Sequence, residues 1–99
     1  MNILLICASG MSTSILVSNM RKYSDQSDHI EAKASSELEK IVDGYDVVLV
    51  GPQIRHEYLK LKDICERHGV VIGLIDMPTY GKMDGRAVME MAKELIKKQ

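Results

Sequence analysis

The sequence has no large excess of charge of either sign, few cysteines and no long apolar run, and it lacks Trp and Phe altogether. Its 99 residues include 13 Lys and Arg against 14 Asp and Glu. The resulting formal net charge of −1 removes the usual electrostatic case for nucleic-acid or membrane-surface binding. No apolar run approaches the ~20 residues that span a bilayer, and the first residues lack the basic region and cleavage site of a signal peptide. The two cysteines show no metal or redox spacing, so we expect free thiols rather than a disulfide.

The remaining composition suits a small globular protein. A hydrophobic fraction of 45% argues against disorder. We therefore expect one domain over residues 1–99 that is cytoplasmic and monomeric. The start at Met1 and the lysine-rich end favour a free-standing chain. Nothing in the sequence calls for a metal or a cofactor.

Short apolar runs alternate with segments of helical periodicity along the chain. The runs predict strands over 3–7, 29–34, 46–50 and 70–75. Helical spacing predicts helices over 12–23, 36–44 and 57–68 and in the C-terminal segment, with Ser36 and Glu39 as a capping box and Pro78 in a loop. This alternation predicts an α/β fold with a parallel four-stranded sheet and helices on both faces. Right-handed crossovers favour the flavodoxin-like strand order 2-1-3-4, with any site beyond the carboxyl ends of the strands at 3–7 and 46–50.

Residues 7–14 occupy that position. Cys7 ends the first strand, and small residues lead from it into a helix: Ala8, Ser9, Gly10, Met11, Ser12, Thr13 and Ser14. The positive end of the helix dipole favours a thiolate, and backbone N–H groups in such a turn can form an anion-binding nest. Gly10 permits close approach and the hydroxyls add donors. This pattern predicts a phosphocysteine site, although Cys7 as a small buried hydrophobe remains an alternative.

The segment departs from cysteine phosphatases at one position. Those enzymes carry an arginine six residues after the cysteine, and this sequence has Thr13 there. The guanidinium that would stabilise a hydrolytic transition state is missing, and Asp76 and Asp84 are candidate acids by location only. The pattern therefore favours a phosphoryl carrier. A low-molecular-weight phosphatase or arsenate reductase, and a non-catalytic flavodoxin-like binding module, stay open.

Three segments, at 7–18, 46–54 and 80–85, resemble the enzyme IIB components of the phosphotransferase system, in the lactose/cellobiose (chitobiose) class. The resemblance implies that a histidine-phosphorylated IIA protein donates to Cys7. Cys7 then passes the phosphoryl group to a sugar that enters through the membrane-embedded IIC component, transiently at the inner face of the membrane. The expected sugar is a β-glucoside or a disaccharide such as cellobiose or chitobiose. The resemblance also implies that the backbone amides from Ala8 to Ser14 hold the phosphoryl oxygens.

Five further residues are weighed as site or core residues. Gln53 should face the Cys7 loop, either as a phosphoryl donor or as a brace. Arg55 and His56 are nearby and are more often solvated than functional. Tyr80 is expected under or beside the loop, and Cys65 in the core.

Overall fold

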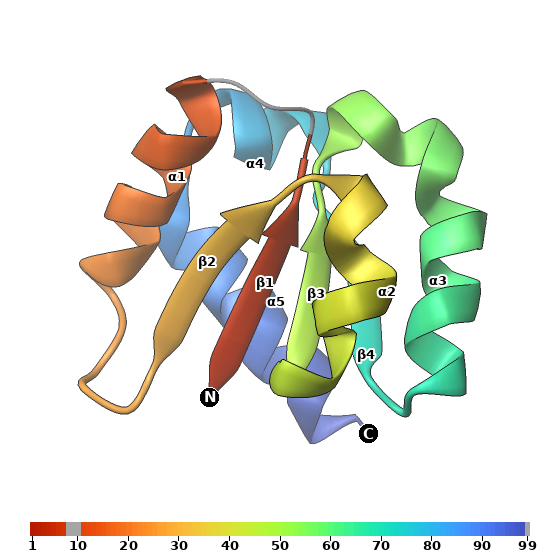
Figure 1. Ribbon diagram of the computed structural model, residues 1–99. Coiled ribbons are helices and arrows are strands. Elements are labelled where there is room, and N and C mark those ends of the chain that lie inside the picture. The colour runs from red at the N-terminus through yellow and green to blue at the C-terminus, as the bar shows by residue number, and fades with distance from the viewer. Residues whose placement is uncertain (8–10, 99) are drawn as a thin grey trace.

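The computed structural model describes residues 1–7 and 11–98, with only the backbone at 11 and 12. Four strands form one parallel sheet in the order β2-β1-β3-β4, which confirms the predicted topology (Figure 1). The strands are β1 (Asn2–Ile6), β2 (His29–Lys33), β3 (Val47–Val50) and β4 (Val71–Leu74). The α-helices are α1 (Met11–Arg21), α2 (Leu38–Ile41), α3 (Tyr58–Arg67), α4 (Met77–Gly81) and α5 (Gly85–Lys97). Three 3₁₀ segments complete the path: η1 (Ser35–Glu37), η2 (Val42–Gly44) and η3 (Pro52–Glu57).

The sheet separates two buried clusters because successive side chains of a strand point to opposite faces. Ile3 and Leu5 of β1 pack with residues of α1 and α5, whereas Leu4 and Ile6 pack with α2 and α3. In Figure 1, α5 passes behind the strands while α2 lies in front of them. The apolar pattern of the strands thus produces the three layers, with helices on both faces as predicted.

The predicted capping box is wrong. It is Glu37, and not Glu39, whose carboxylate accepts a hydrogen bond, from the backbone N–H of Ala34 at 3.4 Å. The Glu39 carboxylate instead pairs with Arg67 on α3 at 3.3 Å. The segment predicted as one helix over 36–44 is divided into η1, α2 and η2, since contacts to α3 compete with the local helical preference.

The predicted loop at Pro78 is also wrong, because Pro78 lies in the first turn of α4. Proline is tolerated there, since the first turn of a helix has no partner for its N–H groups. The Asp76 carboxylate caps this helix by accepting from the Thr79 backbone N–H at 2.8 Å. Residues 76–81 therefore form an ordered turn of helix directly after β4.

A close helix crossing fixes the start of α5. A Cβ on Gly85 would overlap backbone atoms of Asn19 and Met20 on α1. The Asn19 side-chain amide donates to the Met83 carbonyl at 2.8 Å, and Met83 has a left-handed backbone with φ of 50°. Among the described residues no helix is long and apolar enough to cross a membrane.

Candidate active site

The carboxyl ends of β1, β3 and β4 are aligned. Val50 pairs in register with Ile6 on one side and with Leu74 on the other. The next residues continue the ladder, because the Gly51 N–H donates to the Ile6 carbonyl at 2.8 Å and the Ile75 N–H donates to the Val50 carbonyl at 2.9 Å. Cys7, which follows Ile6, therefore lies next to Gly51 at this edge, where the sequence places the candidate site.

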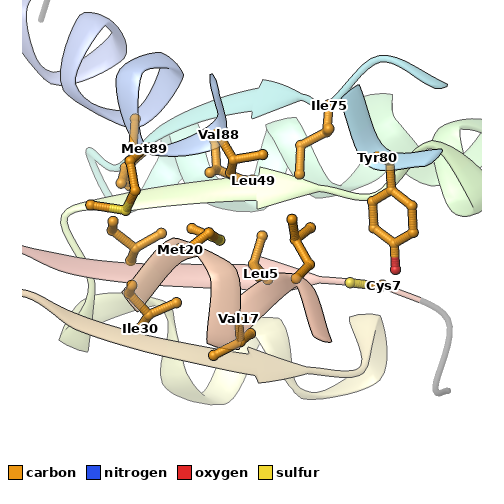
Figure 2. Packing of buried hydrophobic residues seen from close by; sticks show 14 residues of the cluster. Leu5, Cys7, Val17, Met20, Ile30, Leu49, Ile75, Tyr80, Val88 and Met89 are labelled. Atoms are coloured by element: carbon orange, nitrogen blue, oxygen red, sulfur yellow. The ribbon is translucent and has the colours of Figure 1, made fainter. Parts of the chain in front are cut away.

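The Cys7 side chain is nearly buried, with 4% of its surface exposed. The two-residue period of β1 turns it to the same face as Leu5, toward α1 and α4. Figure 2 shows the hydroxyl of Tyr80 pointing toward the Cys7 sulfur. Thr13 on α1 is buried as well, and its Oγ1 lies 3.3 Å from the Tyr80 hydroxyl oxygen. Two hydroxyl groups, from α1 and α4, thus meet at this sulfur.

These neighbours set the acidity of the thiol. Burial raises the pKa of Cys7 above its ordinary value, while hydrogen bonds from the side chains of Thr13 and Tyr80 lower it in part. No charged side chain of the described residues is among the causes of this pKa shift. Desolvation outweighs the two donors, so the net shift of the Cys7 pKa is upward, opposite in direction to the shift that a helix dipole favours.

Gly51 and Gln53 lie against the same cysteine. A Cβ on Gly51 would stand 3.3 Å from the Cys7 Cβ, 3.6 Å from its sulfur and 3.1 Å from the Gln53 Oε1. The backbone of Gly51 is ordinary, with φ of −68°, so the glycine is required for close approach rather than for an unusual conformation. Gln53 is exposed, and its Oε1 lies close to the position of a Cβ on Gly51; the prediction that it faces the Cys7 loop concerns residues outside those described.

The other predicted site residues are placed as follows. Ala8, Ser9 and Gly10 lie outside the described residues, and Met11 and Ser12 open α1. Ser14 is exposed and lines a shallow groove between α1 and β2.

Arg55 and His56 are exposed on η3, and the His56 ring lies 3.8 Å from the Glu57 carboxylate. Cys65 belongs to the core as predicted, and burial raises its pKa to about 11.

Sequence reasoning did not find the contact between Tyr80 and Thr13. A signal was present nonetheless, since Asp76 followed by Pro78 is a typical helix start, with an acidic cap and a proline in the first turn. That start would have placed Tyr80 on a helix at the carboxyl edge of the sheet.

Comparison with known proteins identifies the family. The family model described as "PTS system, Lactose/Cellobiose specific IIB subunit" matches residues 2–91. The chain belongs to this IIB family of the phosphotransferase system. It is 34% identical to the oligo-beta-mannoside-specific EIIB component of Bacillus subtilis (strain 168), over 98% of this chain and 97% of that protein. It is 35% identical to the galactose-specific EIIB component of Lactococcus lactis subsp. cremoris (strain MG1363), over 95% and 94%.

A solved structure agrees with this IIB fold. The cellobiose-specific phosphotransferase IIB component of Borrelia burgdorferi, solved in solution, superimposes with a TM-score of 0.82 at 40% identity. The superposition covers 99% of this chain and 93% of the other. This IIB chain is therefore a component of a sugar phosphotransferase system, in a family of phosphotransferases that works with IIA and IIC components.

Proposed function

We propose that residues 1–99 form one IIB domain that carries a phosphoryl group on Cys7, from a phosphohistidine of IIA to a sugar transported by IIC. The observation that carries the proposal is the placement of the Cys7 sulfur. It lies at the carboxyl edge of the sheet, four residues before α1 begins, with two hydroxyl donors directed at it. A helix N-terminus next to a nucleophile favours negative charge on a bound phosphoryl group.

Each half-reaction moves one phosphoryl group and one proton. The Cys7 sulfur attacks phosphorus in line, the P–N bond to histidine breaks, and an S–P bond forms. Cys7 rests as a thiol because burial raises its pKa, so its proton must leave during the step. The imidazole nitrogen that loses the phosphoryl group accepts one proton, and the products are phosphocysteine and neutral histidine. In the second half-reaction a sugar hydroxyl oxygen attacks phosphorus, an O–P bond forms and the S–P bond breaks. The hydroxyl proton passes to sulfur and restores the thiol.

Hydrolysis is disfavoured by the residue that replaces the phosphatase arginine. Thr13 is buried and engaged with Tyr80, so it offers a neutral hydroxyl where a hydrolase would offer a guanidinium. Without that permanent charge, the transition state for attack by water is poorly stabilised. The site suits a phosphoryl group that must be passed on, rather than one released to water.

The phosphoryl oxygens require donors beyond the two hydroxyls. We assign this role to the backbone amides of residues 8–14 and to the Nε2 group of Gln53, which donates, whereas the Oε1 of the same amide lies near Gly51 and can only accept. The side chains of Ser9, Ser12 and Ser14 contribute less, because helix capping alone accounts for such residues there.

We propose partners and a location that accord with the family. The chain works as a monomer in the cytoplasm, meeting phosphorylated IIA and, at the inner face of the membrane, IIC. We propose a β-linked disaccharide or β-glucoside such as cellobiose as the sugar, in line with 40% identity to a cellobiose-specific component. Sugar uptake by cells that carry this IIB as their only one, measured over a panel of disaccharides, tests the choice.

Intact-mass measurement tests the carrier role. The protein is incubated with phosphoenolpyruvate, the general phosphotransferase proteins and a matching IIA. We expect one added phosphoryl group in the wild type and in Cys65→Ser, and none in Cys7→Ser. An unmodified wild type, or an adduct that persists in Cys7→Ser, would refute the role of Cys7. Turnover of a generic aryl phosphate at an enzymatic rate would instead indicate the phosphatase alternative.

A further inference from the structure

We propose that Tyr80 is a positioning residue for Cys7, whose hydroxyl holds the sulfur ready for attack and stabilises the negative charge it develops. The inference rests on the proposed phosphoryl transfer through Cys7 and extends it to a residue 73 positions away in the sequence. It is carried by the meeting of three side chains near the edge of the sheet: Cys7 directly after β1, Thr13 on α1 and Tyr80 on α4.

The Tyr80 ring is held firmly. It is 4% exposed and belongs to the core cluster on the α1 and α5 side of the sheet. Its backbone N–H donates to the Asp76 carbonyl at 3.1 Å, within the helix that the Asp76 carboxylate caps. Figure 2 shows the ring standing beside the end of β1 with its oxygen toward the Cys7 sulfur. A packed ring on a capped helix leaves its hydroxyl little freedom, which is what a positioning group needs.

The hydroxyl is also oriented by a second group. Thr13 Oγ1 lies 3.3 Å from the Tyr80 oxygen, and either hydroxyl can donate to the other. Hydrogen bonds from both side chains lower the pKa of Cys7. When the sulfur becomes negative, the hydroxyl that donates to its neighbour can turn its single proton to the sulfur instead, so that both hydroxyls donate to the sulfur. A buried hydrogen bond to a charged atom is stronger than one to a neutral atom. The arrangement thus favours the transition state, in which charge develops on sulfur, over the resting thiol.

Among the described residues, no charged side chain contributes to the pKa of Cys7. The Cys7 N–H donates to the Lys33 backbone carbonyl at 3.4 Å, and Gln53 contributes an amide. The Asp76 carboxylate, also at the carboxyl edge, is engaged by the Thr79 N–H. The acidity of the Cys7 thiol therefore depends on Tyr80 and Thr13 more than on any charge of the described residues.

Tyr80→Phe is the direct test, since it keeps the ring and removes only the hydroxyl. The first readout is the titration of the Cys7 Cβ carbon resonance with pH, which requires no phosphoryl donor. We expect its midpoint to move to higher pH, because a donor that lowers the pKa of Cys7 is lost. The second readout is phosphorylation by phosphorylated IIA, in which kcat should fall about tenfold with little change in KM, since the hydroxyl stabilises charge in the transition state.

Tyr45→Phe is the matched control. The Tyr45 hydroxyl donates to the Glu31 carboxylate at 3.2 Å, and Tyr45 precedes β3, at the opposite end of the strand from Gly51. Its removal should change neither readout. If Tyr80→Phe gives the wild-type titration midpoint, or if its whole effect is on KM or is matched by Tyr45→Phe, the positioning role is refuted.

Thr13 supplies a second variant should Tyr80→Phe fail to fold. Thr13→Val should shift the Cys7 titration in the same direction, and Thr13→Ser should restore it because the hydroxyl returns. An unshifted midpoint in Thr13→Val would contradict the proposal. The carrier function of Cys7 and the positioning role of Tyr80 can also be refuted independently of each other. A wild type that accepts no phosphoryl group refutes the carrier function, whereas the titration still decides whether Tyr80 controls the Cys7 thiol.

Discussion

Gly51→Ala should impair phosphoryl transfer while leaving the protein folded. The new methyl carbon would stand 3.3 Å from the Cys7 Cβ and 3.1 Å from the Gln53 Oε1, closer than nearly all ordinary contacts of a Cβ atom. The Gln53 amide can rotate away because the residue is exposed. Cys7 cannot easily do so, because it is packed into the core cluster. Relief of the contact therefore requires a shift of a few tenths of an ångström between β3 and the Cys7 side chain.

The cost to stability should be small. The backbone of Gly51, with φ of −68° and ψ of 146°, suits alanine, and its N–H can still donate to the Ile6 carbonyl. Overpacking costs about 1 kcal/mol at its low end, and the lower entropy of an unfolded chain with alanine offsets about 0.4–1 kcal/mol of that. The net change in the free energy of unfolding should thus lie within about 1 kcal/mol of zero. A misplacement of 1 Å can cost about 100-fold in rate, so a shift of a few tenths predicts a loss of about three- to tenfold.

Two measurements separate these effects. Chemical denaturation gives the stability, and the rate of Cys7 phosphorylation by phosphorylated IIA gives the function. Gly44→Ala is the control, since a Cβ there meets nothing within 4 Å. If the folded Gly51→Ala protein is phosphorylated at the wild-type rate, the reasoning that Cys7 is held in place by its contact with Gly51 is refuted.

Two further predictions concern the frame around the site. Gly85→Ala should lower the free energy of unfolding by about 1–3 kcal/mol, because its Cβ meets backbone that cannot move aside. Gly81→Ala should be neutral or slightly stabilising, because a Cβ there meets nothing within 4 Å. Equal denaturation midpoints for these two variants would contradict that account. Hydrogen bonds from Thr79 lower the pKa of Asp76 below its ordinary value of 3.8, so the stability it contributes is present above that value and is lost as pH falls through the folded pKa. The stability difference between wild type and Asp76→Ala, measured by denaturation across this range, should narrow in acid; a difference independent of pH would count against the cap.

The fold could be predicted because its signals are local. The apolar runs of the strands and the lengths of the helices between them establish a parallel sheet, and crossover handedness then favours the order 2-1-3-4. The position of the candidate site follows from that order, since Cys7 and Gly51 directly follow the ends of two neighbouring strands. These inferences required no knowledge of any side-chain contact.

The parts that were missed depend on contacts between distant segments. The pattern from Ser36 to Glu39 favours a cap, but the pairing of Glu39 with Arg67 and the division of the segment into short turns arise from packing on α3. The contact of Thr13 with Tyr80 joins residues 67 positions apart, and no local pattern specifies it. Tertiary packing overrides propensity at such positions.

The acidity of Cys7 likewise depends on packing that the local sequence does not specify. A helix terminus after the cysteine predicts a thiolate, but the degree of burial is a property of the assembled core, and burial raises the pKa instead. Under the proposed function this is an advantage, because the proton is needed when the histidine nitrogen of IIA loses its phosphoryl group. Neutral hydroxyls from Thr13 and Tyr80 can stabilise charge on sulfur as it develops, whereas a fixed guanidinium would also stabilise attack by water. A nearly buried thiol whose pKa is affected by no cation of the described residues is therefore an arrangement that suits a carrier better than a phosphatase.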